Sequence, residues 1–258
     1  MAEAPEQAAR SRFLQALELL HQRFLIDVPD VTEVWLVRHG DAYAELVSLD
    51  DSNIDPPLSE RGRRQAAQLG SRLAASGVSA VWCSSILRAR ETAEIAARAA
   101  GLPVHVDPRL REVKTHWEDA AGPGGNEVVP GGGYIPFVEP LEEVIERMEA
   151  AVVDIARAVG PGGRVAVITH AGAITMYLAH VLKLDSGPLR VLPQFTSVSV
   201  LRINEERAEA AGATGADAPA LRVEAAGATG ADAPALRVVV ESIGDIGHLH
   251  REPAPADA

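Results

Sequence analysis

The sequence predicts a three-layer α/β/α sandwich in which helices cover both faces of a mostly parallel central sheet. Short apolar runs that fit buried strands, such as ValTrpLeuValArg at 34–38 and ArgValAlaValIleThr at 164–169, alternate with segments of helical periodicity. Strands and helices alternate in this way when crossover helices join parallel strands. At 258 residues, the chain is long enough to bury a sizeable core.

The remaining elements are predicted from periodicity and from residues that start or stop helices. Four interior helices are expected, between Ser, Gly and Pro boundaries, at about 59–76, 88–101, 141–159 and 172–182. Further strands are expected at 80–83, 104–106, 197–203 and 236–241. The last two follow each other without a helical segment between them, which predicts that they pair.

Residues 1–30 are predicted to be a helical extension that precedes the main domain at 31–246. Phe13, Leu17, Leu20 and Phe24 recur at helical spacing within this extension. Their apolar stripe predicts a contact either with the domain or with a second copy of the chain, so a homodimer is one expected arrangement. Residues 247–258 are predicted to be a flexible tail. Their HisXHis pair, His248 and His250, is interpreted as solvent-exposed rather than metal-binding.

A tandem duplication interrupts the last pair of strands. The 15 residues at 209–223 occur again, identically, at 224–238. We interpret residues 209–233 as a low-complexity loop, because a solenoid would need more copies with an apolar face. Only the second LeuArgVal continues into ValValGlu, so we expect that copy to enter the sheet.

Composition excludes several classes of partner. The chain has 24 Lys and Arg against 36 Asp and Glu, a formal net charge of −12, which disfavours nucleic acids and anionic membranes as partners. It lacks an apolar run long enough to span a bilayer, and its N-terminus does not resemble a secretory leader, so a cytoplasmic location is expected. The single Cys83 lies in an apolar run and is interpreted as a buried thiol.

Basic side chains follow three of the predicted strands. Arg38 and His39 end the first, Arg88 comes shortly after the second, and His170 follows the strand at 164–169. Ligands of parallel α/β sheets bind at the carboxyl ends of the strands, so these side chains can converge on one anion. Arginine forks match the oxygens of a phosphoryl group, and a neutral imidazole can act as its nucleophile.

Five short motifs in order resemble the histidine phosphatase superfamily, which includes the phosphoglycerate mutases. They are ValArgHisGlyAsp (37–41), ProProLeuSerGluArgGly (56–62), SerSerIleLeuArgAlaArgGluThrAla (84–93), ArgLeuArgGlu (109–112) and ThrHisAlaGly (169–172). The resemblance covers about 33–203. It implies a phosphoglycerate mutase-like fold and hydrolysis of a small phosphorylated substrate without a metal or an organic cofactor.

The resemblance also implies a role for each matching residue. His39 would be the phosphorylated nucleophile, Arg38, Arg88 and His170 would bind the phosphoryl group, and Glu112 would be the general acid. Other carboxylates close in sequence could replace Glu112, namely Asp107, Glu118 and Asp119. Substrate contacts are expected from Tyr43, Arg111, Trp117 and Tyr134.

Departures from the family pattern separate hydrolysis from its alternatives. Ala42 and Glu45 stand where family members often have Ser or Thr and Asn, and the insert typical of true mutases is missing from 113–140. These features favour hydrolysis over a mutase reaction. Two other readings stay open: a protein phosphohistidine phosphatase, which the AspAla after HisGly resembles, and a non-catalytic module that binds a phosphorylated ligand.

Overall fold

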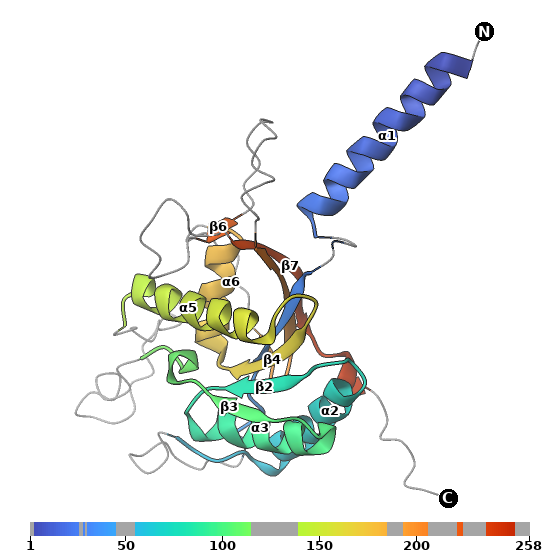
Figure 1. The fold of residues 1–258 in the computed structure, drawn as a ribbon. Helices are drawn as coiled ribbons and strands as arrows, with labels where there is room; N and C mark the ends of the chain where they lie inside the picture. Colours follow the sequence, from blue (N-terminus) through green and yellow to red (C-terminus); the bar gives the residue numbers. More distant parts are fainter. Residues whose placement is uncertain are drawn as a thin grey trace, which may run out of the picture.

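A seven-stranded sheet forms the centre of the molecule in a computed structural model (Figure 1). The structure describes residues 3–25, 28, 30–44, 55–114, 139–184, 193–205, 221–223 and 236–250. The strand order is β3-β2-β4-β1-β5-β7-β6. The strands are β1 (Thr32–Arg38), β2 (Ala80–Cys83), β3 (Val104–Val106), β4 (Arg164–Thr169), β5 (Val198–Glu205), β6 (Leu221–Val223) and β7 (Leu236–Asp245).

The sheet has a parallel half and an antiparallel half. Strands β3, β2, β4 and β1 run parallel, whereas β5, β7 and β6 join them through antiparallel pairs. The prediction of a parallel sheet describes the first half, and the predicted pairing of the last two long strands is confirmed. In the parallel half Arg38 lies opposite Thr169, so His39 and His170, the next residues of each strand, leave the sheet at the same edge.

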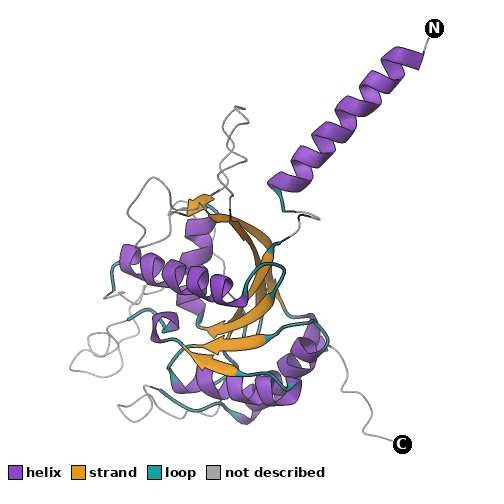
Figure 2. Ribbon diagram, viewed as in Figure 1, coloured by secondary structure: helices purple, strands orange, loops and turns teal. Residues whose placement is uncertain are grey.

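Helices cover both faces of the sheet, which confirms the three-layer prediction (Figure 2). Helices α2 (Glu60–Ala74) and α3 (Leu87–Ala100) pack on one face, where Trp35 and Val37 of β1 are buried. Helices α5 (Leu141–Val159) and α6 (Ala171–Val181) pack on the other face, against Val34 and Leu36. Alternate residues of one strand therefore contribute to two separate apolar clusters.

Local signals place the helix that borders the site. The Ser59 side chain accepts a hydrogen bond from the Gly62 backbone N–H and caps α2, as predicted. A Cβ added at Gly62 would lie 2.0 Å from the Asp41 carbonyl oxygen. Glycine at position 62 therefore allows the first turn of α2 to pack directly against the loop that carries His39 and Gly40.

The predicted N-terminal helix is present as α1 (Glu3–Arg23) and points away from the sheet (Figure 1). Phe13, Leu17, Leu20 and Phe24 are 36–65% exposed, so all four side chains of this stripe are at least partly exposed. Burial begins at Leu25, which is 2% exposed. None of the described helices is both long and apolar enough to cross a membrane.

Both copies of the duplicated LeuArgVal are strands. The second copy starts β7, as predicted, but the first copy forms β6, so the loop assignment was wrong for Leu221–Val223. The two triplets pair with each other, with Leu221 opposite Val238 and Val223 opposite Leu236. Because the triplets are identical in sequence, the first copy can form a strand as readily as the second. It does so at the open edge of the sheet, next to β7.

The expected exposure of the C-terminal histidines was wrong for His248. It lies in the 3-10 turn η4 (Gly247–His250) and is 5% exposed. Its Nε2 is 3.2 Å from Thr196 Oγ1, and its Nδ1 is 3.3 Å from an Arg72 guanidinium nitrogen. Two tertiary contacts therefore fix the turn against the domain.

Candidate active site

His39 stands at the carboxyl end of β1 with a defined tautomer. Its ring is 1% exposed, and Nδ1 is 2.7 Å from the carbonyl oxygen of Gly40. A carbonyl can only accept a hydrogen bond, so Nδ1 carries the proton and Nε2 carries the lone pair. That lone pair accepts a hydrogen bond from Arg88 Nε at 3.2 Å.

The environment keeps the His39 ring neutral. Burial is the largest cause of a pKa lowered to about 3, and the Arg88 and Arg38 cations lower it further against the opposing bond to Gly40. The ring is therefore unprotonated at neutral pH. A neutral imidazole with a lone pair on Nε2 can act as a nucleophile without a base.

Two guanidinium groups flank this ring. Arg88, in the first turn of α3, is 7% exposed and lies 3.4 Å from the Asp55 carboxylate. Arg38 donates to the Pro193 carbonyl at 2.9 Å and stacks over the Phe195 ring, with 4.0 Å between its Cζ and the ring centroid. Phe195 thereby fixes the plane of a fork that can bind two oxygens of a phosphoryl group.

His170 faces His39 across the edge of the sheet. The ring centroids are 5.1 Å apart, and His170 Nε2 is 2.9 Å from the Ser84 hydroxyl oxygen. Burial, followed by the nearby His39 and Arg88, holds the pKa of His170 well below the usual value of a histidine. Ser84 is fully buried and fixes the orientation of this ring.

Two buried polar atoms around His39 lack a hydrogen-bond partner among the described residues. They are Arg38 Nε and His170 Nδ1. Buried polar atoms are nearly always paired, and an orphan costs about 1–3 kcal/mol. An anion held between these side chains would accept a hydrogen bond from both.

Glu112 follows the 3-10 turn η2 (Pro108–Leu110) and caps the start of α6. Its Oε1 accepts from the Ala173 N–H at 3.1 Å and from the Val113 N–H at 2.9 Å, while Oε2 is 3.4 Å from the Gly172 nitrogen. Helix N-termini favour a carboxylate. A Cβ at Gly172 would lie 2.7 Å from Glu112 Oε1, so only glycine leaves room for the carboxylate there.

An ion-pair network supports the segment around Glu112. Arg111 and Arg147 both bind the buried Glu139, and Arg147 also donates to the carbonyls of Arg109 and Arg111. Burial alone would raise the pKa of Glu139, but bonds from Arg111 and Arg147 lower it to about 2. The Arg111 guanidinium is therefore engaged in this network, and its contact with substrate stays a prediction.

The other sequence-predicted residues divide between the site and its surroundings. Tyr43 is 41% exposed, and its ring centroid is 6.2 Å from that of His39. Trp117 and Tyr134 lie outside the described residues. Cys83 is buried, and its pKa is raised to about 12 by burial, which agrees with the predicted inert thiol.

Sequence reasoning missed two parts of the site. Ser84 stood in a recognised motif, but its contact with His170 depends on how β2 lies beside β4. Phe195 had no sequence signal, since a single aromatic residue outside any periodic segment does not reveal what it packs against.

Comparisons with known proteins agree with this geometry. The family model "Histidine phosphatase superfamily (branch 1)" matches residues 34–213. A relative from Cronobacter sakazakii named "Probable phosphoglycerate mutase GpmB" is 32% identical over 211 residues, which cover 73% of this chain and 97% of the relative.

Solved structures extend the likeness to the fold. A mycobacterial glucosyl-3-phosphoglycerate phosphatase shares 25% identity at a TM-score of 0.52, over 67% of this chain and 90% of that one. A phosphoserine phosphatase from Entamoeba histolytica is 15% identical at a TM-score of 0.54, over 84% of this chain and 99% of that one, and shows the likeness of fold alone. The chain belongs to the histidine phosphatase superfamily (branch 1), as its motifs and the convergence of two arginines and two histidines also indicate.

Proposed function

We propose that this enzyme hydrolyses phosphomonoesters in two steps through a phosphohistidine at His39. The observation that carries the proposal is the tautomer of a buried neutral ring: Nδ1 is fixed by Gly40, and Nε2 points to the Arg88 guanidinium. The orphaned Arg38 Nε and His170 Nδ1 support a phosphoryl group at this place.

In the first step His39 Nε2 attacks phosphorus, and the bond from phosphorus to the ester oxygen breaks. The two arginines and His170 stabilise the charge of the transferring oxygens. Glu112 in its protonated form would supply the proton that the leaving alkoxide needs. An alcohol departs, and the phosphoryl group stays on Nε2.

In the second step a water molecule attacks the phosphohistidine. The Glu112 carboxylate accepts a proton from that water as the bond from nitrogen to phosphorus breaks. Inorganic phosphate leaves, and the neutral ring with its Nε2 lone pair is restored. None of the groups in this scheme is a metal ion or an organic cofactor.

A mutase reaction is the second candidate, because the relatives at about 30% identity bear the name of phosphoglycerate mutase. A mutase must keep water from its phosphohistidine until the phosphoryl group returns to the substrate. Hydrolysis is favoured by the missing mutase insert in the sequence at 113–140 and by the phosphatase named among the structural neighbours.

The deciding experiment combines trapping with product analysis. The wild type, quenched during turnover of a phosphomonoester panel, should carry one phosphoryl group on His39 by peptide mass spectrometry, and His39→Ala should carry none. Free phosphate should be the main product with or without EDTA, and vanadate should inhibit. An isomerised ester without free phosphate would establish a mutase. Phosphate released only from phosphohistidine proteins would establish a protein phosphohistidine phosphatase. Binding of the ester without labelling of His39 would establish a non-catalytic module.

Two further proposals concern the chain as a whole. We propose that it acts in the cytoplasm on small substrates. We also propose that it forms a homodimer through the exposed stripe of Phe13, Leu17, Leu20 and Phe24 on α1. Light scattering should then give twice the chain mass for the wild type and the chain mass after Leu17→Glu and Leu20→Glu. A monomeric wild type would contradict the dimer.

A further inference from the structure

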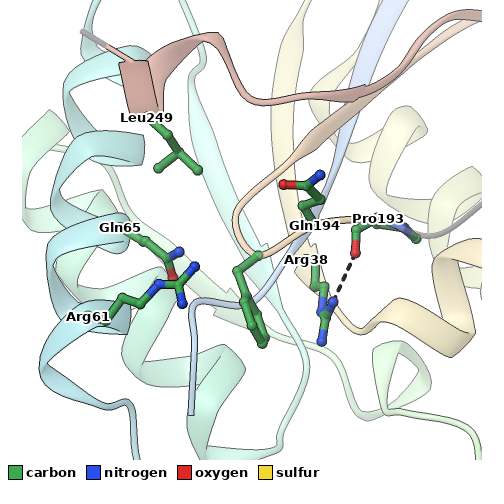
Figure 3. Close-up of a pocket in the computed structure, with 7 residues that line it drawn as sticks. Arg38, Arg61, Gln65, Pro193, Gln194 and Leu249 are labelled. Carbon is green, nitrogen blue, oxygen red and sulfur yellow. Dashed lines mark hydrogen bonds between the residues drawn. The ribbon is translucent and has the colours of Figure 1, made fainter. Parts of the chain in front are cut away.

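A cavity of about 210 Å³ lies beside Arg38 (Figure 3). It is smaller than the 300–1,000 Å³ typical of drug-sized ligands, so it suits a group of a few carbon atoms. Its wall combines polar and apolar residues. Among the described residues they are Arg38, Arg61, Gln65, Pro193, Gln194, Phe195 and Leu249.

The cavity shares two walls with the phosphoryl site. Arg38 and Phe195 line it, and the Phe195 ring centroid is 5.8 Å from that of His39. On the far side Arg61 and Gln65 extend from α2 (Figure 3). A phosphomonoester bound at Arg38 therefore has this cavity within reach of its carbon skeleton.

Arg61 differs from its neighbours on α2. Arg63 lies 3.8 Å from Glu91, and Arg64 lies 3.5 Å from Glu60, but Arg61 has no ion-pair partner in the part of the chain that the structure describes. It also stands in the first helical turn, where the helix dipole disfavours a cation. Arg61 is exposed on the cavity wall and unpaired among the described residues, so its charge is available to an anionic group on a ligand.

Gln65 adds a directed donor to the same wall. Its Oε1 accepts the Asp41 backbone N–H at 2.9 Å, and this bond fixes which end of the amide is occupied. The NH₂ end keeps its donors. Arg38, Arg61 and Gln65 thus bring hydrogen-bond donors to the cavity. Pro193, Phe195 and Leu249 give it apolar surface that suits a short carbon chain.

We propose that this cavity binds the leaving group and that Arg61 pairs with a second anionic group on it, a deepening that rests on the proposed function. The substrates would be phosphomonoesters of short carbon skeletons that carry a carboxylate or a second phosphate. Arg61 is the specificity residue in this scheme, and the phosphoryl chemistry at His39 does not involve it.

Matched substrates test the proposal. 3-Phosphoglycerate and glycerol 3-phosphate differ by a carboxylate against a hydroxymethyl group, and 1,3-propanediol bisphosphate and its monophosphate differ by a second phosphate. For the wild type, kcat/KM should favour one or both charged members about threefold to fivefold, the size of an ion pair with an exposed partner. The preference should shrink as salt is added.

The variants separate Arg61 from general charge. Arg61→Gln should reduce the preference to about one, Arg61→Lys should keep part of it, and Arg64→Gln, on the same helix, should leave it unchanged. The inference is wrong if the wild type hydrolyses the charged and uncharged members of each pair with equal kcat/KM, or if a preference survives Arg61→Gln. In either case, release of phosphate would still support the proposed function. If no ester of the four and of the wider panel releases phosphate, the proposed function itself fails.

Discussion

At the scale of single residues, burial gives an ordinary histidine the neutral ring that its proposed role as nucleophile needs. An exposed imidazole would be partly protonated near its usual pKa of about 6.5 and would then lack a lone pair. His39 avoids this because it is buried beside two cations, which lowers its pKa to about 3, and because Gly40 holds the proton on Nδ1. The same cations that are proposed to bind the substrate therefore also help to keep the His39 ring neutral.

Gly172 offers a test of Glu112 that does not remove the carboxyl group. In Gly172→Ala the added Cβ would lie 2.7 Å from Glu112 Oε1, so the flexible end of that side chain must move. Alanine is also the better helix former by about 0.5–1 kcal/mol. This gain and the weakened Glu112 cap of α6 oppose each other, so we expect the stability in urea to stay within about 1 kcal/mol of the wild type. The kcat should fall about tenfold to a hundredfold, within the range for a displaced general acid.

Two comparisons check that this loss acts through Glu112. With 4-nitrophenyl phosphate, whose leaving group needs little protonation, the loss should be several times smaller than with an alkyl phosphate. In a Glu112→Gln background, Gly172→Ala should cost little more, because both changes affect one group. Equal losses with both esters would show that the alanine disturbs the phosphoryl site instead.

At the scale of elements, sequence patterns predicted what local chemistry determines. Ser59 capped its helix and Gly101 closed the next one in a left-handed conformation, as expected from their residue types. The strand-end positions of His39 and His170 also followed from apolar runs with basic ends. By contrast, the stacking of Phe195 on Arg38 and the burial of His248 join residues far apart in the chain, which no local pattern encodes.

The duplicated segment should be dispensable. Because its copies are identical and adjacent, deleting either one leaves the same chain, with an intact LeuArgValValVal for β7. Halving the connection between β5 and β7 gains at most about 0.6 kcal/mol of loop entropy, offset by the loss of the three pairs of β6. The thermal midpoint should move by less than about 3 °C, with unchanged activity.

A single substitution provides the contrast for this deletion. Val238 is 6% exposed and lies opposite Ile203 in the sheet, so Val238→Asp would bury a carboxylate without a partner. Calorimetry should show a clearly lower midpoint for this variant. If the deletion lowered the midpoint as much as Val238→Asp does, the duplicated segment would be an integral part of the sheet.

At the scale of the whole molecule, the site imposes a pH dependence on folding. His39 and His170 are 1% and 0% exposed, and both pKa values are lowered, to about 3 for His39. Above pH 6.5 each ring is neutral in both the folded and the unfolded chain and contributes no pH dependence. Below pH 6.5 these two histidines take up protons in the unfolded chain but not in the folded chain. The free energy of unfolding therefore decreases as the pH is lowered.

For His39 the free energy of unfolding should fall by about 1.4 kcal/mol per pH unit below pH 6.5, or about 2 kcal/mol by pH 5, and His170 should add to this fall. Glu139 cannot produce this slope, because the stability that its lowered pKa contributes is lost only below its ordinary value of 4.5. Urea unfolding at pH 7, 6 and 5 measures the slope, and His170→Gln should make it shallower. If the variant kept the full slope, His170 would not contribute to it. The ring would then take up its proton within the folded protein, and the inference that the fold lowers its pKa would be wrong.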